Sequence, residues 1–240
     1  NQIADRIIKL NKAKNMKKVS NIEKELRLIE EKTDIILSEK QKEAIRTIND
    51  NNVTIITGGP GTGKTTIIKS IIDIYKEKKY KIVLCAPTGR AAKRMTETTG
   101  EEASTLHRLL EIGKVDEESL FKKDSDYQGA PIDGDIIIVD EVSMVDMFIM
   151  SYLLDCIYLG TKLILVGDSD QLPSVGPGSV LHDLIASERI ATVHLDKIFR
   201  QAAKSKIIVN AHRVNSGKGF IGKEDPELEE DSKQDFFFIK

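Results

Sequence analysis

Hydrophobic and polar residues alternate along this chain with two different periods, which predicts helices and strands in turn. Apolar residues at helical spacing predict one or two helices within residues 3–31, and Ser38 followed by Gln41 forms a capping box that begins another. Short β-branched and aliphatic runs then predict strands at 53–57, 81–86, 135–139, 162–167 and 190–195. The stretches between them predict helices at 64–79, 90–98, 106–112, 145–157 and 180–186.

Strands that alternate with helices are typical of a parallel sheet covered by helices on both faces. We therefore expect an α/β fold with a short N-terminal helical segment (1–37) and one larger domain (38–216). Residues 113–134 are polar and predict a small insertion, either a hairpin or a plain surface loop. Residues 217–240 predict a linker that ends in an apolar run, which we expect to begin a truncated second domain.

Composition excludes several classes of protein. The chain has 240 residues, 40% hydrophobic and 31% charged, which fits neither a disordered nor a membrane protein. No apolar run approaches the ~18 residues that a membrane-spanning helix needs. The two cysteines, Cys85 and Cys156, are far apart, which excludes a disulfide scaffold and fits the cytoplasm. We expect a cytoplasmic protein that does not bind membranes.

The formal net charge of −2 at first argues against a nucleic-acid partner. The charge is unevenly distributed, however. Residues 224–240 contain seven acidic residues and two lysines, so this segment carries −5 and the rest of the chain carries +3. The body of the protein is therefore mildly basic, which leaves a nucleic-acid partner open; a solvated lysine-rich surface is the alternative.

One segment has the pattern G-x-x-x-x-G-K-[ST] directly between a predicted strand and a predicted helix. Its backbone N–H groups and the helix N-terminus would bind phosphate, Lys64 would reach the β- and γ-phosphates, and Thr65 would ligate Mg²⁺. A purely structural turn is the alternative, which this context disfavours. The predicted nucleotide-binding residues of this phosphate loop are Gly58, Gly59, Pro60, Gly61, Thr62, Gly63, Lys64, Thr65 and Thr66.

Acidic and amide side chains follow two further predicted strands. Asp140 and Glu141 come after an apolar strand, where ligands bind in open α/β sheets. Asp140 is the predicted Mg²⁺ partner, and Glu141 is the predicted general base for an attacking water, which favours hydrolysis over transfer to a small acceptor. Gln171, in the loop after strand 162–167, could contact a γ-phosphate. A helix cap and a polar turn are the respective alternatives.

Together these segments resemble the RecD family of superfamily 1 helicases, which includes the exodeoxyribonuclease V alpha chain and its stand-alone relatives. The most specific matches are 140–144 (DEVSM) and 167–178 (GDSDQLPSVGPG). Weaker matches, in the family's order, are residues 37–41, 86–94, 104–110, 195–201 and 235–239.

This resemblance implies a RecA-like P-loop motor domain that hydrolyses ATP with Mg²⁺ and moves 5′→3′ on single-stranded DNA in recombination and repair. It implies that Arg200 reaches the γ-phosphate and that Gln41 reads adenine, although the capping box competes for the same amide. It also implies partner subunits of a helicase or nuclease complex and a second motor domain beyond Lys240. The fragment itself should therefore hydrolyse ATP slowly.

The same resemblance assigns DNA contacts to two segments. Arg90, Lys93 and Arg94 share one helix face, which could follow a phosphate backbone or could be an ordinary solvated face. His107 could equally be structural. The predicted DNA-binding residues are Pro87, Thr88, Arg90, Lys93, Arg94, Thr105 and His107.

Two other functions remain open from the residues themselves. One is a different phosphate-loop enzyme, such as a small-molecule kinase, although no basic lid segment is evident. The other is a nucleotide-gated DNA-binding module in which binding matters and turnover does not. Acceptor-dependent transfer that survives Glu141→Gln would favour the first.

Overall fold

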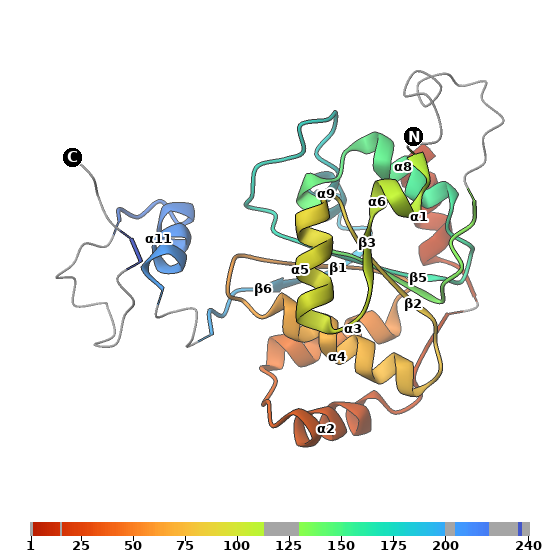
Figure 1. The fold of residues 1–240 in the computed structure, drawn as a ribbon, viewed down its shortest axis with the longest axis horizontal. Helices are drawn as coiled ribbons and strands as arrows, with labels where there is room; N and C mark the ends of the chain where they lie inside the picture. The colour runs from red at the N-terminus through yellow and green to blue at the C-terminus, as the bar shows by residue number, and fades with distance from the viewer. Residues whose placement is uncertain (1, 15, 113–129, 200–204, 221–234, 237–240) are drawn as a thin grey trace.

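The computed structural model describes residues 2–14, 16–112, 130–199, 205–220 and 235–236. In this part of the chain, six strands form one parallel sheet in the order β3-β2-β4-β5-β1-β6 (Figure 1). The strands are β1 (Val53–Gly58), β2 (Ile82–Ala86), β3 (Ala103–Thr105), β4 (Ile136–Val139), β5 (Lys162–Gly167) and β6 (Ala191–Leu195). The predicted α/β class with a parallel sheet is confirmed.

Helices cover both faces of the sheet (Figure 1). One face carries α1 (Gln2–Asn11), α6 (Leu106–Leu109), α8 (Met147–Asp155) and α9 (Val180–Ala186). The other carries α3 (Glu39–Asp50), α4 (Lys64–Glu77) and α5 (Gly89–Thr99), with α2 (Ile22–Thr33) packed outside α3 and α4. The 3₁₀ turn η2 (Val142–Met144) precedes α8, and α11 (Lys206–Asn215) follows β6.

The central strands are buried on both faces of the sheet, and for this reason their sequences are continuous hydrophobic runs. Every residue of β4 and β5 is buried. Two hydrophobic clusters, one on each face, account for most of the core. The N-terminal segment contributes to both, because Ile7 and Leu10 of α1 join one cluster, and Leu26 and Ile29 of α2 join the other. The proposed boundary at residue 37 remains a prediction.

Most predicted elements agree with the structure to within a few residues, and the differences have local causes. The helix predicted at 145–157 begins at Met147, since the Asp146 side chain accepts a hydrogen bond from the Ile149 N–H at 2.9 Å and caps it. The helix predicted at 106–112 ends at Leu109. Residues 113–129, which make up most of the predicted insertion at 113–134, lie outside the described residues.

Three of the described elements have no counterpart in the sequence prediction, namely β3, α11 and the short turn η2. Strand β3 has only three residues, and pairing with β2, which places Leu84 opposite Ala103, is what defines it. Helix α11 presents Ile207 and Val214 to solvent, so it lacks a clear buried stripe. In the described residues, no helix is long and apolar enough to span a membrane.

The most unusual core residue is Lys162, whose side chain is fully buried at the start of β5. Its ammonium donates to the carbonyl oxygens of Ile48, Asn51 and, at 3.4 Å, Asn49. These carbonyls lie at the C-terminal end of α3, where backbone acceptors have no partner within the helix. Lys162 therefore ties the end of α3 to the sheet.

Burial lowers the pKa of Lys162 from 10.5 to about 7, against the attraction of Asp50. Between these values the unfolded chain binds one more proton than the folded chain, so the free energy of unfolding should rise as pH increases from 7 towards 10.5. The contribution is at most about 1.4 kcal/mol per pH unit. Urea unfolding of the wild type and Lys162→Met across this range measures it; equal pH slopes in the two proteins would contradict it.

Candidate nucleotide-binding site

Parallel pairing brings the ends of three central strands to one edge of the sheet. Thr57 of β1 lies opposite Gly167 of β5, and Val139 of β4 lies opposite Leu165. The segments that follow, namely the phosphate loop, Asp140–Glu141 and the loop after β5, must therefore start side by side. Residues that are far apart in sequence are thus assembled into a single site.

The phosphate loop folds around the side chain of Lys64. The Lys64 ammonium donates to the carbonyl oxygen of Gly58 and, at 3.0 Å, to that of Gly59. The Thr62 hydroxyl donates to the Gly59 carbonyl at 2.8 Å, which closes the loop. Lys64 is also the first residue of α4, so its neighbouring N–H groups point along the helix axis towards the loop.

Glycine is required at the end of the loop. Gly63 has a φ of +86°, which disfavours any residue with a Cβ. A Cβ there would also lie 2.4 Å from the side-chain nitrogen of Gln41 and 2.9 Å from the Phe199 ring. Any side chain at Gly63 would therefore disturb both the loop and its neighbours.

Gln41 takes part in two interactions at once. Its Oε1 accepts the Ser38 N–H at 2.9 Å, and Ser38 Oγ accepts the Gln41 N–H at 3.3 Å, which confirms the predicted capping box. Its Nε2 donates to the Gly63 carbonyl at 3.4 Å. The cap therefore orients the Gln41 amide towards the phosphate loop. Adenine reading by Gln41 remains a prediction.

Negative charge gathers around Lys64. Burial lowers the pKa of Lys64, and the carboxylates of Asp168, Glu141 and Asp140 act in the opposite direction. Burial also raises the pKa of Asp140 and of Glu141, and in Glu141 the charge of Asp140 raises it further. Raised pKa values mean that the surroundings do not fully stabilise the negative charges of these carboxylates. A cation added beside them would therefore be bound favourably.

The backbone holds Glu141 in an unusual conformation. Its φ of 53° is left-handed, which is uncommon for a residue with a Cβ and occurs at functional sites. The Asp140 carboxylate accepts the Glu141 N–H at 2.9 Å. The two acids are therefore held in fixed relative positions directly after β4.

The donor set suits Mg²⁺ bound together with phosphate. Mg²⁺ prefers oxygen ligands and is usually held by one or two carboxylates plus substrate phosphates. In the described residues, no group of three or more His, Cys, Asp or Glu residues could hold a metal ion by itself. Thr65 and the half-buried Asp140, whose raised pKa indicates unbalanced negative charge, fit such a shared site.

The loop after β5 is attached to both neighbouring strand ends. The Ser143 hydroxyl donates to Gln171 Oε1 at 3.3 Å, which links this loop to the segment after β4. The Ser169 N–H donates to Thr57 Oγ1 at 3.0 Å, which links it to β1. Gln171 is exposed, and the hydrogen bond from Ser143 ties its side chain to the segment after β4.

The segment after β6 also contacts the phosphate loop. The Phe199 N–H donates to the Gly61 carbonyl at 3.1 Å. Arg200, the predicted γ-phosphate contact, lies outside the described residues. The residue before it, Phe199, is held against the loop by this hydrogen bond.

The predicted DNA contacts lie along the same edge of the sheet, after β2 and β3. Ala86 of β2 pairs with Thr105 of β3, so the segments that follow these strands start together. Thr88 caps α5 by accepting the Ala91 N–H at 3.2 Å, and Thr105 caps α6 by accepting the Arg108 N–H at 3.2 Å. Pro87, directly after β2, is partly buried.

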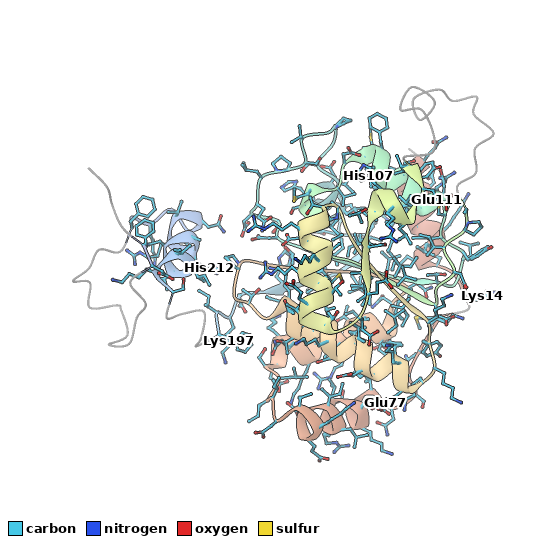
Figure 2. The ribbon with its side chains drawn as sticks, in the orientation of Figure 1. Lys14, Glu77, His107, Glu111, Lys197 and His212 are labelled. Atoms are coloured by element: carbon cyan, nitrogen blue, oxygen red, sulfur yellow. The ribbon has the colours of Figure 1, made fainter. Side chains whose placement is uncertain are left out.

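The cationic side chains of α5 face solvent. Arg90, Lys93 and Arg94 are exposed, while Ala92 and Met95 on the opposite side are buried. Lys93 is 3.8 Å from Glu97, an exposed pair that contributes little to stability. His107 is exposed on α6 (Figure 2). This arrangement agrees with a basic face, while DNA binding by it remains a prediction.

Two residues of the site have no role in the sequence prediction. Asp168 is only 4% exposed and is the leading carboxylate influence on Lys64; its place after a strand within the 167–178 match is a signal that could have identified it. His212 of α11 lies 3.0 Å from the Pro60 carbonyl. His212 belongs to none of the sequence motifs described above, and only the fold brings it to the loop.

A family model described as an AAA domain matches residues 41–177, more than half of the chain. The chain is 41% identical over 182 residues to the ATP-dependent RecD2 DNA helicase of Deinococcus radiodurans, covering 76% of this chain and 24% of that protein. It is 39% identical over 164 residues to the RecBCD enzyme subunit RecD of Buchnera aphidicola, covering 60% of this chain and 26% of that one. The chain thus spans about a quarter of these relatives.

The fold has a counterpart among solved structures. Bacteroides Pif1, crystallised bound to ssDNA, aligns with a TM-score of 0.50 and 23% identity, over 78% of this chain and 47% of that chain. At this identity the likeness shows the fold only. It agrees with the parallel sheet and helix layers described above.

The close packing at Gly63 makes a direct prediction. Gly63→Ala should weaken MgADP binding at least about tenfold, because the left-handed conformation costs ~1 kcal/mol and the added methyl displaces Gln41 or Phe199. Gly89→Ala is the matched control, since a Cβ there meets nothing within 4 Å. Calorimetric titration gives both dissociation constants; equal affinities would show that the loop tolerates a side chain.

Proposed function

The chain belongs to the AAA domain family and has RecD-type DNA helicases as relatives, and we propose that it is the ATP-hydrolysing motor domain of a 5′→3′ DNA helicase. The observation that carries this proposal is the convergence of Lys64, Asp140 and Glu141 at one sheet edge beside the phosphate loop. The chain covers about a quarter of the length of these relatives, so helicase activity of the whole protein is part of what we propose.

ATP binding requires Lys64 to exchange partners. Its ammonium donates to loop carbonyls of Gly58 and Gly59, and a β- or γ-phosphate would offer it stronger, charged acceptors. The backbone N–H groups of the loop and of the first turn of α4 would bind the remaining phosphate oxygens. Thr65 and Asp140 would hold Mg²⁺, which neutralises charge that develops on the phosphates.

Hydrolysis then needs a base and a charge sensor. Glu141 would accept a proton from the attacking water, and its raised pKa brings it closer to neutral pH, where a base is most effective. Gln171, attached through Ser143, would respond to the γ-phosphate. We assign the transition-state contact to Arg200, which follows the segment held against Gly61.

DNA is the proposed track. The exposed cations of α5 and the capped turns at Thr88 and Thr105 lie along the sheet edge that also carries the nucleotide site. This arrangement supports binding to the phosphate backbone of a single strand with little sequence preference. Partner subunits belong to the same proposal, because the Buchnera relative is a subunit of the RecBCD enzyme.

Two substitutions test the proposed chemistry. Lys64→Ala should abolish detectable nucleotide binding, whereas Glu141→Gln should retain binding and lower ATP turnover at least about a hundredfold. Phosphate release by the full-length protein in the presence of single-stranded DNA measures turnover. Turnover that survives both changes would contradict the motor assignment, and transfer to an added acceptor that survives Glu141→Gln would favour a kinase.

The DNA face can be tested by charge removal. Replacing Arg90, Lys93 and Arg94 with Ala should weaken single-stranded DNA binding and reduce the salt dependence of the association constant by up to about two units of log–log slope. Replacing the exposed Lys9, Lys24 and Lys69 with Ala gives a control with the same loss of three charges. Fluorescence anisotropy across salt concentrations supplies the slopes; the same slope in wild type and triple variant would contradict the assignment.

A further inference from the structure

Helix α11 contacts the phosphate loop through His212, which lies on the side of the helix that faces the main body (Figure 2). The Nε2 atom of His212 is 3.0 Å from the carbonyl oxygen of Pro60. A carbonyl can only accept, so Nε2 carries the proton and donates it. The ring also packs closely on Gly59, where a Cβ would lie 2.6 Å from it.

This hydrogen bond fixes the direction of a loop peptide. In a planar trans peptide, the C=O and the following N–H point to opposite sides. Holding the Pro60 carbonyl towards α11 therefore turns the Gly61 N–H away from α11. The next peptide is held in a similar way, because the Phe199 N–H donates to the Gly61 carbonyl at 3.1 Å.

Such control matters because a phosphate loop binds through consecutive N–H groups. An anion-binding concavity forms only when successive N–H groups converge on one point. Within the loop, Thr62 and Lys64 hold the Gly59 carbonyl at 2.8 and 3.0 Å. The Pro60 carbonyl is instead held from outside the loop, by the His212 ring of α11.

A second contact seats α11 beside the site. Asn215 Nδ2 donates to Asp170 Oδ2 at 2.6 Å, and Asn215 lies three residues after His212 on the same helix face. At the other end of α11, Asp235 accepts the Lys206 N–H at 2.9 Å and the Ser205 hydroxyl at 2.7 Å. The helix thus spans from the phosphate loop and the β5 loop to Asp235.

We propose that His212 is a positioning residue for nucleotide binding, which orients the Pro60–Gly61 peptide of the phosphate loop, and that Asn215 seats α11 so that His212 can do so. The inference rests on the proposed function and deepens it. It assigns α11 as the element that links the nucleotide site to the segment around Asp235.

The test is the dissociation constant of this chain for MgADP, measured by isothermal titration calorimetry. His212→Ala should raise it about fivefold, the effect expected when one N–H aimed at a charged group is no longer held in place. His212→Gln should restore most of the affinity, because its amide can donate to the same carbonyl. His182→Ala, at an exposed position on α9, should leave the affinity unchanged.

Asn215 gives an independent arm of the test. Asn215→Asp places a second carboxylate against Asp170, and like-charge repulsion should displace α11 and raise the dissociation constant as much as His212→Ala does. Asn215→Ala, which removes the hydrogen bond without adding repulsion, should have a smaller effect in the same direction.

Equal affinities of His212→Ala and wild type would overturn the inference, and so would a His212→Gln variant as weak as His212→Ala. A full-length protein that binds MgADP without hydrolysing ATP on single-stranded DNA would contradict the proposed function, while the affinity comparison on this chain would still decide the role of His212. A wild type that fails to bind MgADP would overturn both.

Discussion

The parallel alignment of the six strands is the constraint on which the site depends. Because all strands run the same way, every segment that follows a strand emerges at one edge of the sheet. The phosphate loop, the acidic pair and the β5 loop therefore meet there, although they are separated by up to about a hundred residues in sequence. Buried β-branched residues on both faces keep the strands in register, so the core indirectly positions the chemistry.

Because these segments meet, one ammonium group and several carboxylates lie close together at the site. Lys64 lies partly buried among carboxylates whose own pKa values are raised at Asp140 and Glu141, and it uses carbonyls of its own loop as acceptors. A nucleotide bound with Mg²⁺ would give the Lys64 ammonium a charged acceptor. The Mg²⁺ ion would give the carboxylates a cation. The same site would therefore change its contacts between its nucleotide-free and nucleotide-bound forms, and the segments attached to it at Ser143, Phe199 and His212 are those positioned to respond.

The sequence was most informative where local chemistry dictates structure. The Ser38–Gln41 capping box and the apolar runs of β4 and β5 each follow from residue types at fixed spacing, and the structure confirms them. Strand β3 could not be predicted, since three residues become a strand only through pairing with β2. The contact of His212 with Pro60 joins residues far apart in sequence and depends on tertiary packing, so no local pattern reveals it.

The central event expected at the site is the exchange of the Lys64 ammonium between loop carbonyls and phosphate. A crystal structure of the chain with MgADP and a γ-phosphate mimic measures this directly. We expect Lys64 Nζ to lie within hydrogen-bonding distance of phosphate oxygens and to be no longer bonded to the Gly58 carbonyl, with Mg²⁺ between Thr65 and the Asp140 side of the site. A nucleotide bound at another place, or Lys64 still on the carbonyls of Gly58 and Gly59 with the nucleotide present, would contradict it.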